Sequence, residues 1–197
     1  MEPLPQIILA SASPRRAELL SQIGIRYRIE VADINETVAD SELPQVAVSR
    51  LATEKAERVW RQYGVSEEPP LPVLGADTIV VNHGKVLQKP TSREAAIEML
   101  SQLSGKVHEV MSAVSVVCDR GIHRCLSSSQ VTFREISEVE CLNYWATGEP
   151  ADKAGGYAIQ GVGAIFVKQL EGSYSGVMGL PLFETIQLLN KVGVKVL

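Results

Sequence analysis

Residues 73–81 of this sequence read Val-Leu-Gly-Ala-Asp-Thr-Ile-Val-Val, an apolar run that contains a single carboxylate. A short apolar run rich in β-branched residues predicts a buried strand. A carboxylate in such a strand is costly unless it is paired, binds a metal or changes its protonation state. Asp77 is therefore the first candidate functional residue. The alternative is a structural aspartate that local backbone or hydroxyl donors satisfy.

Shorter strands and amphipathic helices alternate on both sides of this strand. We expect strands at residues 6–10, 27–32, 107–118, 122–136 and 164–170, and helices at residues 14–23, 43–63, 92–103, 137–147 and 182–191. A turn at residues 119–121 predicts an antiparallel hairpin. Early alternation with an inserted hairpin indicates an α/β protein with a mixed sheet. Because no long linker interrupts the pattern, we expect a single domain over residues 1–197.

Composition excludes several classes of protein. The 197 residues contain 19 Lys and Arg against 23 Asp and Glu, a net charge of −4, which argues against a surface that binds nucleic acid generally. Three cysteines cannot all pair, so we expect reduced thiols and a cytoplasmic protein. The three histidines lack the spacing of a zinc site. No apolar run reaches the length of a membrane span, and no basic start precedes the first apolar residues as in a secretory signal.

A cluster of small and basic residues follows the first expected strand. Residues 11–16 read Ser-Ala-Ser-Pro-Arg-Arg, with Ser13 expected as N-cap and Pro14 at the first helical position. Arg15 and Arg16 add positive charge where the helix dipole already disfavours it, and an anion would relieve that conflict. The alternative is that one arginine is solvated and the other pairs with a surface acid.

Further charged residues interrupt the apolar pattern elsewhere. Lys55 falls within the apolar stripe of the long helix, and Lys89 precedes a proline. Each is either a phosphate ligand or a lysine whose stem covers apolar surface while its charge reaches water. Glu36 follows the second expected strand and is either a solvated acid or a metal ligand.

Residues 152–163 form a glycine-rich stretch, Asp-Lys-Ala-Gly-Gly-Tyr-Ala-Ile-Gln-Gly-Val-Gly. Glycines allow a backbone to approach a ligand closely, while Lys153 and Gln160 supply a charge and a carboxamide. The alternative is a turn-rich connector. Cations for a polyphosphate, two carboxylates for Mg²⁺ and an amide for a base edge together indicate metal-assisted nucleotide hydrolysis.

Seven strings in this order resemble the Maf family of nucleoside triphosphate pyrophosphatases. They are SASPRR, Leu51-Ala52-x-x-Lys55-Ala56, GADT, LQKP, LSGKVHEVMSAV, DKAGGYAIQG and Gly179-Leu180-Pro181. The resemblance implies an inosine-triphosphate-pyrophosphatase-like fold: an elongated mixed sheet with flanking helices and two lobes around a central cleft. It also implies frequent homodimers and cleavage of nucleoside triphosphates between the α- and β-phosphates with Mg²⁺ or Mn²⁺.

The same resemblance assigns roles to residues. Asp77 matches the catalytic proton acceptor, with Glu36 and Asp77 as metal ligands. The substrate-binding positions match Ser11, Arg15, Arg16, Lys55, Lys89 and Lys153. Departures are small: Gly156 stands where Ala is common, and Ser112 where Thr is common.

Three positions distinguish substrate branches within the family. This sequence has Arg15, Thr78 and Gln160, as the dTTP/UTP branch does, where the 7-methyl-GTP branch carries Trp, Gln and Glu. We therefore expect a dTTP/UTP pyrophosphatase. The alternatives are a 7-methyl-GTP pyrophosphatase and a nucleotide-binding regulator of septum formation and cell division.

Overall fold

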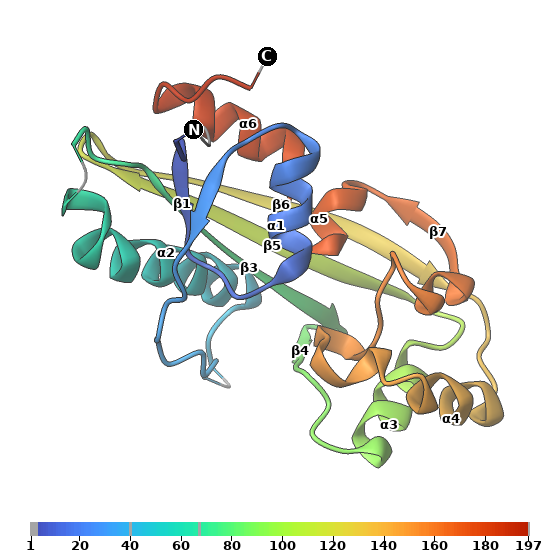
Figure 1. Cartoon of the computed structure of the whole chain (residues 1–197). Coiled ribbons are helices and arrows are strands. Elements are labelled where there is room, and N and C mark those ends of the chain that lie inside the picture. Colours follow the sequence, from blue (N-terminus) through green and yellow to red (C-terminus); the bar gives the residue numbers. More distant parts are fainter. Residues whose placement is uncertain (1–3, 40, 67, 197) are drawn as a thin grey trace. The chain divides into compact units, whose positions relative to one another are not determined.

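The computed structural model of the chain describes residues 4–39, 41–66 and 68–196 (Figure 1). Its α-helices are α1 (Pro14–Gln22), α2 (Pro44–Gln62), α3 (Arg93–Leu103), α4 (Glu138–Ala146), α5 (Tyr174–Met178) and α6 (Leu182–Lys191). Its strands are β1 (Ile7–Leu9), β2 (Tyr27–Ile29), β3 (Val73–Asn82), β4 (Lys85–Leu87), β5 (Val107–Cys118), β6 (Gly121–Phe133) and β7 (Val167–Glu171). Short 3₁₀ turns lie at Gly64–Ser66, Glu149–Asp152, Ala154–Gly156 and Val162–Phe166.

The strands form one seven-stranded sheet in the order β2-β1-β3-β5-β6-β7, with β4 beside β3. β1 is parallel to both β2 and β3, whereas β3–β4 and β6–β7 are antiparallel. This arrangement confirms the predicted α/β class and mixed sheet. Within the described part of the chain, no helix is both long enough and apolar enough to cross a membrane.

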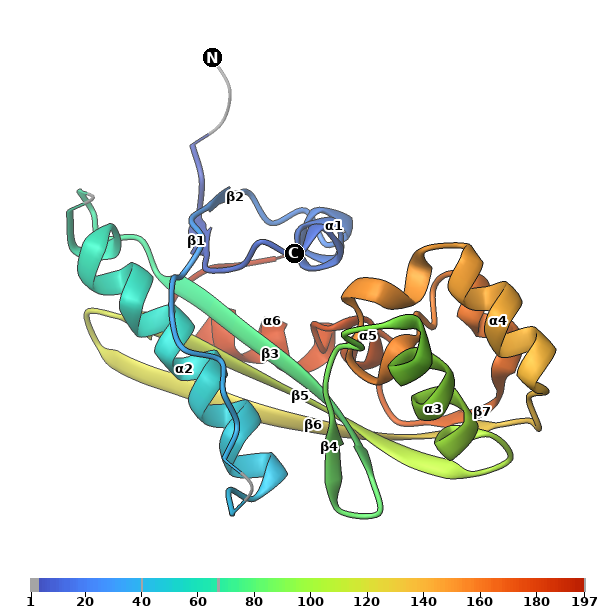
Figure 2. The same ribbon diagram turned by 90° about the horizontal axis from the view of Figure 1, so that it is seen from below.

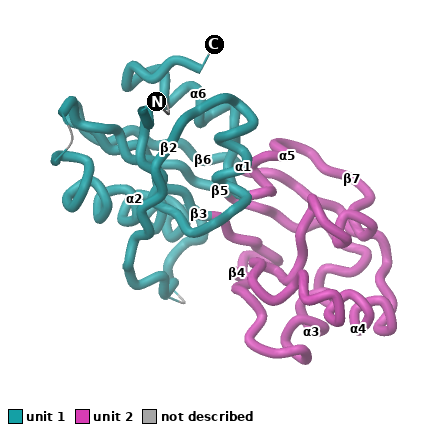
Figure 3. The backbone as a smooth tube through the Cα atoms, in the orientation of Figure 1, with its two compact units in different colours: residues 1–77, 112–127, 179–197 teal, residues 78–111, 128–178 magenta. Residues whose placement is uncertain are grey.

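The chain groups into two compact units (Figure 3). Unit 1 contains the described residues within 1–77, 112–127 and 179–197, and unit 2 contains residues 78–111 and 128–178. Each unit is interleaved in sequence, because β3, β5 and β6 contribute residues to both. The single domain over residues 1–197 stays a prediction.

Unit 1 is built on the parallel strands. The first residues of β3 and all of β1 are fully buried, as expected for strands covered on both faces. Helix α2 runs beside β3 (Figure 2) and packs Ala56 and Val59 onto Ile8, Val73 and the neighbouring strands. Burial of these side chains supplies the main stabilising free energy of this unit.

Unit 2 has an aromatic core. Phe133 of β6 contacts the rings of His108, Tyr157 and Phe166, with centroid distances of 4.8, 4.7 and 6.1 Å. His108 is 3% exposed, and its Nε2 lies 2.7 Å from the Tyr157 hydroxyl. Helices α3 and α4 pack against each other in this unit.

Most predicted elements are present, with local differences in their bounds and in the short elements. The predicted strand 164–170 begins only at Val167, because residues 162–166 form a 3₁₀ turn. Strand β4 and helix α5 were not predicted. The predicted capping box of Ser137 and Glu140 is confirmed, as are Ser13 at the N-cap position of α1 and Pro14 at its first helical position. The Ser13 side chain makes no capping hydrogen bond among the described residues.

Candidate functional site

The centre of the site in unit 1 is a lysine held between two carboxylates. Lys55 Nζ lies 2.8 Å from Asp77 Oδ1 and 3.0 Å from Glu36 Oε1. The side chains of Lys55 and Asp77 are 8% and 11% exposed, whereas that of Glu36 is 53% exposed. The cost of burying the Asp77 charge is therefore offset by a direct ion pair, one of the outcomes that the sequence allowed for this residue.

A glycine allows this ion pair to form. Gly75 lies two residues before Asp77, where a Cβ would overlap the Ala52 carbonyl oxygen and come within 2.7 Å of the Ala56 amide nitrogen. Both atoms belong to the backbone of α2, and Lys55 lies between Ala52 and Ala56 in the sequence of this helix. The bare glycine therefore lets α2 approach β3 closely enough for Lys55 to reach Asp77.

The end of β1 brings a second cation, Arg16, toward the same carboxylates. Pairing with β3 continues past the strand, since the Ala10 amide donates to the Leu74 carbonyl at 2.8 Å. Arg16 donates from Nη1 to Ser11 Oγ at 3.1 Å and from Nε to the Gly179 carbonyl at 2.9 Å. Arg16 is thus fixed at the turn between β1 and α1.

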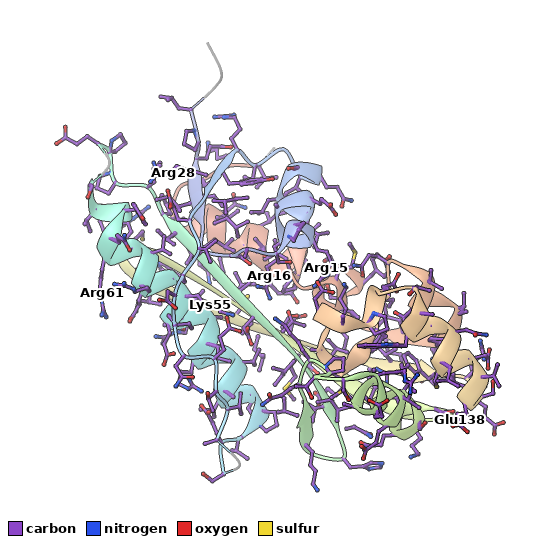
Figure 4. All side chains as sticks on the ribbon, turned by 60° about the horizontal axis from the view of Figure 1, so that its bottom comes forward. Arg15, Arg16, Arg28, Lys55, Arg61 and Glu138 are labelled. Atoms are coloured by element: carbon purple, nitrogen blue, oxygen red, sulfur yellow. The ribbon has the colours of Figure 1, made fainter. Side chains whose placement is uncertain are left out.

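The electrostatic surroundings of Arg16 are mixed. Burial lowers the pKa of its guanidinium, the negative charges of Asp77 and Glu36 raise it, and the adjacent Arg15 lowers it further. Arg16 therefore lies within electrostatic range of Arg15 and of the two carboxylates. Figure 4 labels Arg15 and Arg16 on α1 and Lys55 on α2.

The first turn of α1 favours an anion. It contains no acidic residue, and the Ser13 side chain does not cap it within the described residues. The backbone amide of Ser13 instead donates to Ser11 Oγ at 3.2 Å. Two arginines in a first turn that contains no acidic residue form an arrangement that negative groups such as phosphates stabilise.

The segment that carries Glu36 is tied to α2 by a residue that the sequence analysis missed. Arg50 forms a bidentate pair with Glu42, with Nε–Oε1 and Nη2–Oε2 distances of 2.8 Å, and Nη2 also donates to the Thr37 carbonyl at 3.1 Å. The hydrogen bonds and negative charges of Glu42 and Glu54, with the hydrogen bond to Glu42 contributing most, raise the pKa of Arg50. The i,i+4 spacing of Arg50 and Glu54 was visible in the sequence, but the contact with Glu42 depends on how the loop folds back.

The remaining predicted residues belong to unit 2. Lys89 and Gln160 are exposed, and Thr78 is half-buried on β3. Lys153 is more enclosed: its Nζ donates to the Glu149 carbonyl at 3.2 Å and to the Asp152 carboxylate. Lys153 and Gln160 lie on one loop of this unit, within residues 153–163.

Two further residues of unit 2 organise that loop and were not singled out from the sequence. Glu149 accepts hydrogen bonds from the Val162 and Gly163 amides at 2.9 and 3.0 Å, and from the Tyr144 hydroxyl at 2.5 Å. Tyr144 also accepts from the Ala158 amide at 3.1 Å. For Glu149, the only available sequence signal was an acidic residue inside a stretch rich in glycine and proline.

The carboxylates of unit 1 suit a hard divalent cation. Glu36 and Asp77 supply oxygen donors, and Mg²⁺ characteristically takes one or two carboxylates together with substrate phosphates and water. The described residues contain no cluster of three or more His, Cys, Asp or Glu side chains that could enclose an ion by themselves. The donor set therefore fits a metal that is completed by a phosphorylated ligand.

The chain is similar to known proteins over almost its whole length. The family described as "Maf-like protein" matches residues 6–192. A relative in Alkalilimnicola ehrlichii, named dTTP/UTP pyrophosphatase, is 54% identical over 95% of this chain and 93% of its own. A relative of the same name in Saccharophagus degradans is 50% identical over 96% and 90%. The solved Ham1 protein of Staphylococcus aureus is a distant likeness, with a TM-score of 0.39 and 15% identity over 67% of this chain and 72% of its own.

Proposed function

Because this chain belongs to the Maf family, we propose that it is a nucleoside triphosphate pyrophosphatase that hydrolyses dTTP and UTP to the monophosphate and pyrophosphate. The observation that carries the proposal is the buried Lys55 ammonium between Asp77 and Glu36. Relatives that are named dTTP/UTP pyrophosphatase and match nearly the whole chain support the choice of substrate.

In this proposal Asp77 accepts the proton of the attacking water. The Lys55 ammonium donates to Asp77 Oδ1 at 2.8 Å and holds this carboxylate in a fixed position. The water oxygen bonds to the α-phosphorus, the bond to the bridging oxygen of the β-phosphate breaks, and pyrophosphate leaves. A positioned base of this kind contributes roughly 10²–10⁴-fold to a rate.

The cations bind and orient the triphosphate. Arg15, Arg16 and Lys55 offset the negative charge of the substrate and the charge that develops on the leaving pyrophosphate. Ser11 holds Arg16 in place through the 3.1 Å hydrogen bond to its Nη1. We also propose substrate contacts for Lys89 and Lys153, on the sequence resemblance alone.

Glu36 and Asp77 would hold a divalent cation, Mg²⁺ or Mn²⁺. When bound, such an ion stabilises charge on the phosphoryl oxygens in the transition state. Lys55 then keeps the two carboxylates close to each other before the metal and substrate arrive, since its Nζ contacts both.

Arg15, Thr78 and Gln160 determine the base in this proposal. A carboxamide can pair with the O4 and N3–H edge of thymine and uracil. A polar group that is left unpaired by the wrong base disfavours that base. The same three positions argue against 7-methyl-GTP as the substrate.

A nucleotide panel tests the proposed function. Purified protein with Mg²⁺ or Mn²⁺ should release pyrophosphate from dTTP and UTP, with much lower kcat/KM for 7-methyl-GTP and for purine triphosphates. Tight dTTP binding without turnover would instead favour a regulatory role, and preferential turnover of 7-methyl-GTP would contradict the assigned branch.

The proposal also includes the oligomeric state of the protein and its cellular compartment. We propose a homodimer, which light scattering of the purified protein measures. We also propose a cytoplasmic setting, which the free thiols of Cys118, Cys125 and Cys141 support because disulfides are rare in that compartment.

A further inference from the structure

The loop that carries Gln160 contains one tight turn, and hydrogen bonds hold this turn at both of its ends. The Gly161 amide donates to the Ala158 carbonyl at 3.2 Å, which closes a turn with Ile159 and Gln160 at its tip. Ile159 is buried in the core of unit 2, whereas Gln160 is exposed. The turn therefore anchors one side chain in the protein and presents the next one to solvent.

Tyr144 and Glu149 fix the two ends of this turn to each other. Tyr144 accepts from the Ala158 amide, where the turn begins, and donates to Glu149 at 2.5 Å. Glu149 accepts from the amides of Val162 and Gly163, just after the turn. The Tyr144 hydroxyl donates its one proton to the Glu149 carboxylate, which only accepts. Each of these N–H and O–H donors therefore has an acceptor within the network.

The glycines of the loop fit this arrangement. A Cβ at Gly161 would overlap the Glu149 carboxylate, and one at Gly163 would lie 2.5 Å from the Tyr144 hydroxyl. Both glycines are thus accounted for by the close approach of Tyr144 and Glu149 to the loop backbone, which requires no glycine contact with a ligand.

The charge state of Glu149 agrees with its role as an acceptor. Burial alone would raise its pKa, but hydrogen bonds from Tyr144 and from the Gly163 and Val162 amides, together with the charge of Lys153, hold the pKa below its ordinary value. Lys153 also donates to the Glu149 backbone carbonyl. Glu149 is therefore linked directly to Lys153, the other residue of the loop with a proposed substrate contact.

We propose that Tyr144 and Glu149 are positioning residues that give the enzyme its selectivity for thymine and uracil over cytosine by holding Gln160 in place. The inference rests on the proposed role of Gln160 in reading the base. A carboxamide carries both a donor and an acceptor, so its chemistry alone does not separate uracil or thymine from cytosine. Discrimination needs a fixed position, and misplacement by about 1 Å can cost roughly 100-fold in rate.

The test compares discrimination between dTTP and dCTP in four variants. The ratio of their kcat/KM values should fall roughly 10- to 100-fold in Glu149→Gln, Tyr144→Phe and Gln160→Ala. Glu140→Gln is the matched control, because Glu140 is a carboxylate of the same unit that also accepts three hydrogen bonds, from Arg134 and from the amide and hydroxyl of Ser137. Its ratio should equal that of the wild type.

A double-mutant cycle separates positioning from a general structural defect. Once Gln160 is alanine, Glu149→Gln should lower the dTTP/dCTP ratio no further. Amide hydrogen exchange over residues 158–163 should be faster in Glu149→Gln and Tyr144→Phe, a result that needs no turnover. Tyr144→Phe keeps the ring that packs on Phe166 and so provides a second variant if Glu149→Gln does not fold.

The outcomes distinguish this inference from the proposed function. An unchanged ratio in Glu149→Gln and Tyr144→Phe, with a collapsed ratio in Gln160→Ala, overturns the inference and leaves the proposed function standing. An unchanged dTTP/dCTP ratio in Gln160→Ala would show that Gln160 does not recognise the base, and it would overturn the inference as well. If the wild type releases no pyrophosphate from any nucleotide, the proposed function fails, and unchanged exchange over residues 158–163 would separately overturn the role of Tyr144 and Glu149.

Discussion

Lys55 Nζ lies 2.8 Å from Asp77 Oδ1, and both side chains are almost fully buried. Removing the Lys55 charge leaves Asp77 without this partner in an apolar strand, whereas removing the Asp77 charge leaves Lys55 its contact with Glu36. Lys55→Met should therefore lower the free energy of unfolding by about 3–5 kcal/mol, as breaking a buried ion pair does. Urea denaturation measures the change.

The double variant provides the check on this explanation. Lys55→Met combined with Asp77→Asn removes both charges, so it should be more stable than Lys55→Met alone. Lys168→Met, an exposed lysine of β7, should stay within about 0.5 kcal/mol of the wild type. A double variant that is less stable than the single one would show that the ion pair is not the source of the loss.

Gly75→Ala tests whether close packing of α2 on β3 creates the site. The added Cβ would overlap the Ala52 carbonyl and approach the Ala56 amide, so α2 must shift and move Lys55 from Asp77. Overpacking of this kind costs about 1–3 kcal/mol. We expect both lower stability and at least a tenfold loss of pyrophosphate release, since a misplaced group loses roughly 10²-fold in rate.

Gly84→Ala is the contrasting variant. Gly84 has a left-handed φ of +77° but no atom within 4 Å of a Cβ, so the substitution strains the backbone without moving α2. Its stability should fall while kcat is retained. Equal losses of activity in Gly75→Ala and Gly84→Ala would argue against a positional role for Gly75.

Arg50→Met should weaken metal binding through Glu36. Arg50 ties the adjacent Thr37 carbonyl and Glu42 to α2, so its loss frees the segment that carries Glu36. Loss of groups that orient a metal ligand typically costs about 10–100-fold in affinity. The Mn²⁺ concentration for half-maximal activity should rise by that factor, and titration of Mn²⁺ without nucleotide should show the same shift.

Arg61→Met serves as the control on the same helix. Arg61 pairs with Glu57 at 3.0 Å on an exposed face of α2. Its metal dependence should match the wild type. A similar shift in Arg61→Met and Arg50→Met would mean that any change in the charge of α2 suffices.

His108 predicts a pH dependence of stability in unit 2. Burial lowers its pKa from an ordinary value near 6.5 to about 4. Between pH 6.5 and 4, His108 is therefore protonated in the unfolded chain and neutral in the folded chain. The free energy of unfolding consequently decreases as the pH falls from 6.5 to 4. The loss from this group is at most about 3 kcal/mol, and it is absent above pH 6.5.

Denaturation at several pH values checks that sign. His108→Gln should flatten the fall in stability between pH 6.5 and 4, whereas His83→Gln, which changes an exposed turn residue, should not. A wild-type protein that becomes more stable on acidification through this window, relative to His108→Gln, would contradict a neutral buried His108.

Local patterns account for what was predictable in the fold. The apolar run at 73–81 and the capping box at Ser137 are signals within a few residues, and the structure contains both elements. Strand β4 was missed because its three residues are too few to show alternation. It exists because His83 and Gly84, both with positive φ, turn the chain back onto β3.

Long-range contacts account for what was not predictable in the site. The sequence identified Asp77, Lys55 and Glu36 by residue type, but their mutual distances depend on the packing of α2 on β3. The weak sequence signals of Arg50 and Glu149 did not reveal their roles, because each acts on backbone groups of a loop whose path only the folded chain defines. Periodicity reports which face of an element is buried, and it does not report which loop returns to that face.

The most direct test of the central claim is the product released from dTTP in the presence of Mg²⁺ by the wild type, Asp77→Asn and the control Asp119→Asn, which alters an exposed turn residue. The wild type should release dTMP and pyrophosphate, and Asp119→Asn should release the same amounts of both products as the wild type. Asp77→Asn should lose roughly 10²–10⁴-fold in kcat while it remains folded. Release of inorganic phosphate with dTDP, or full activity in folded Asp77→Asn, would contradict the proposed mechanism.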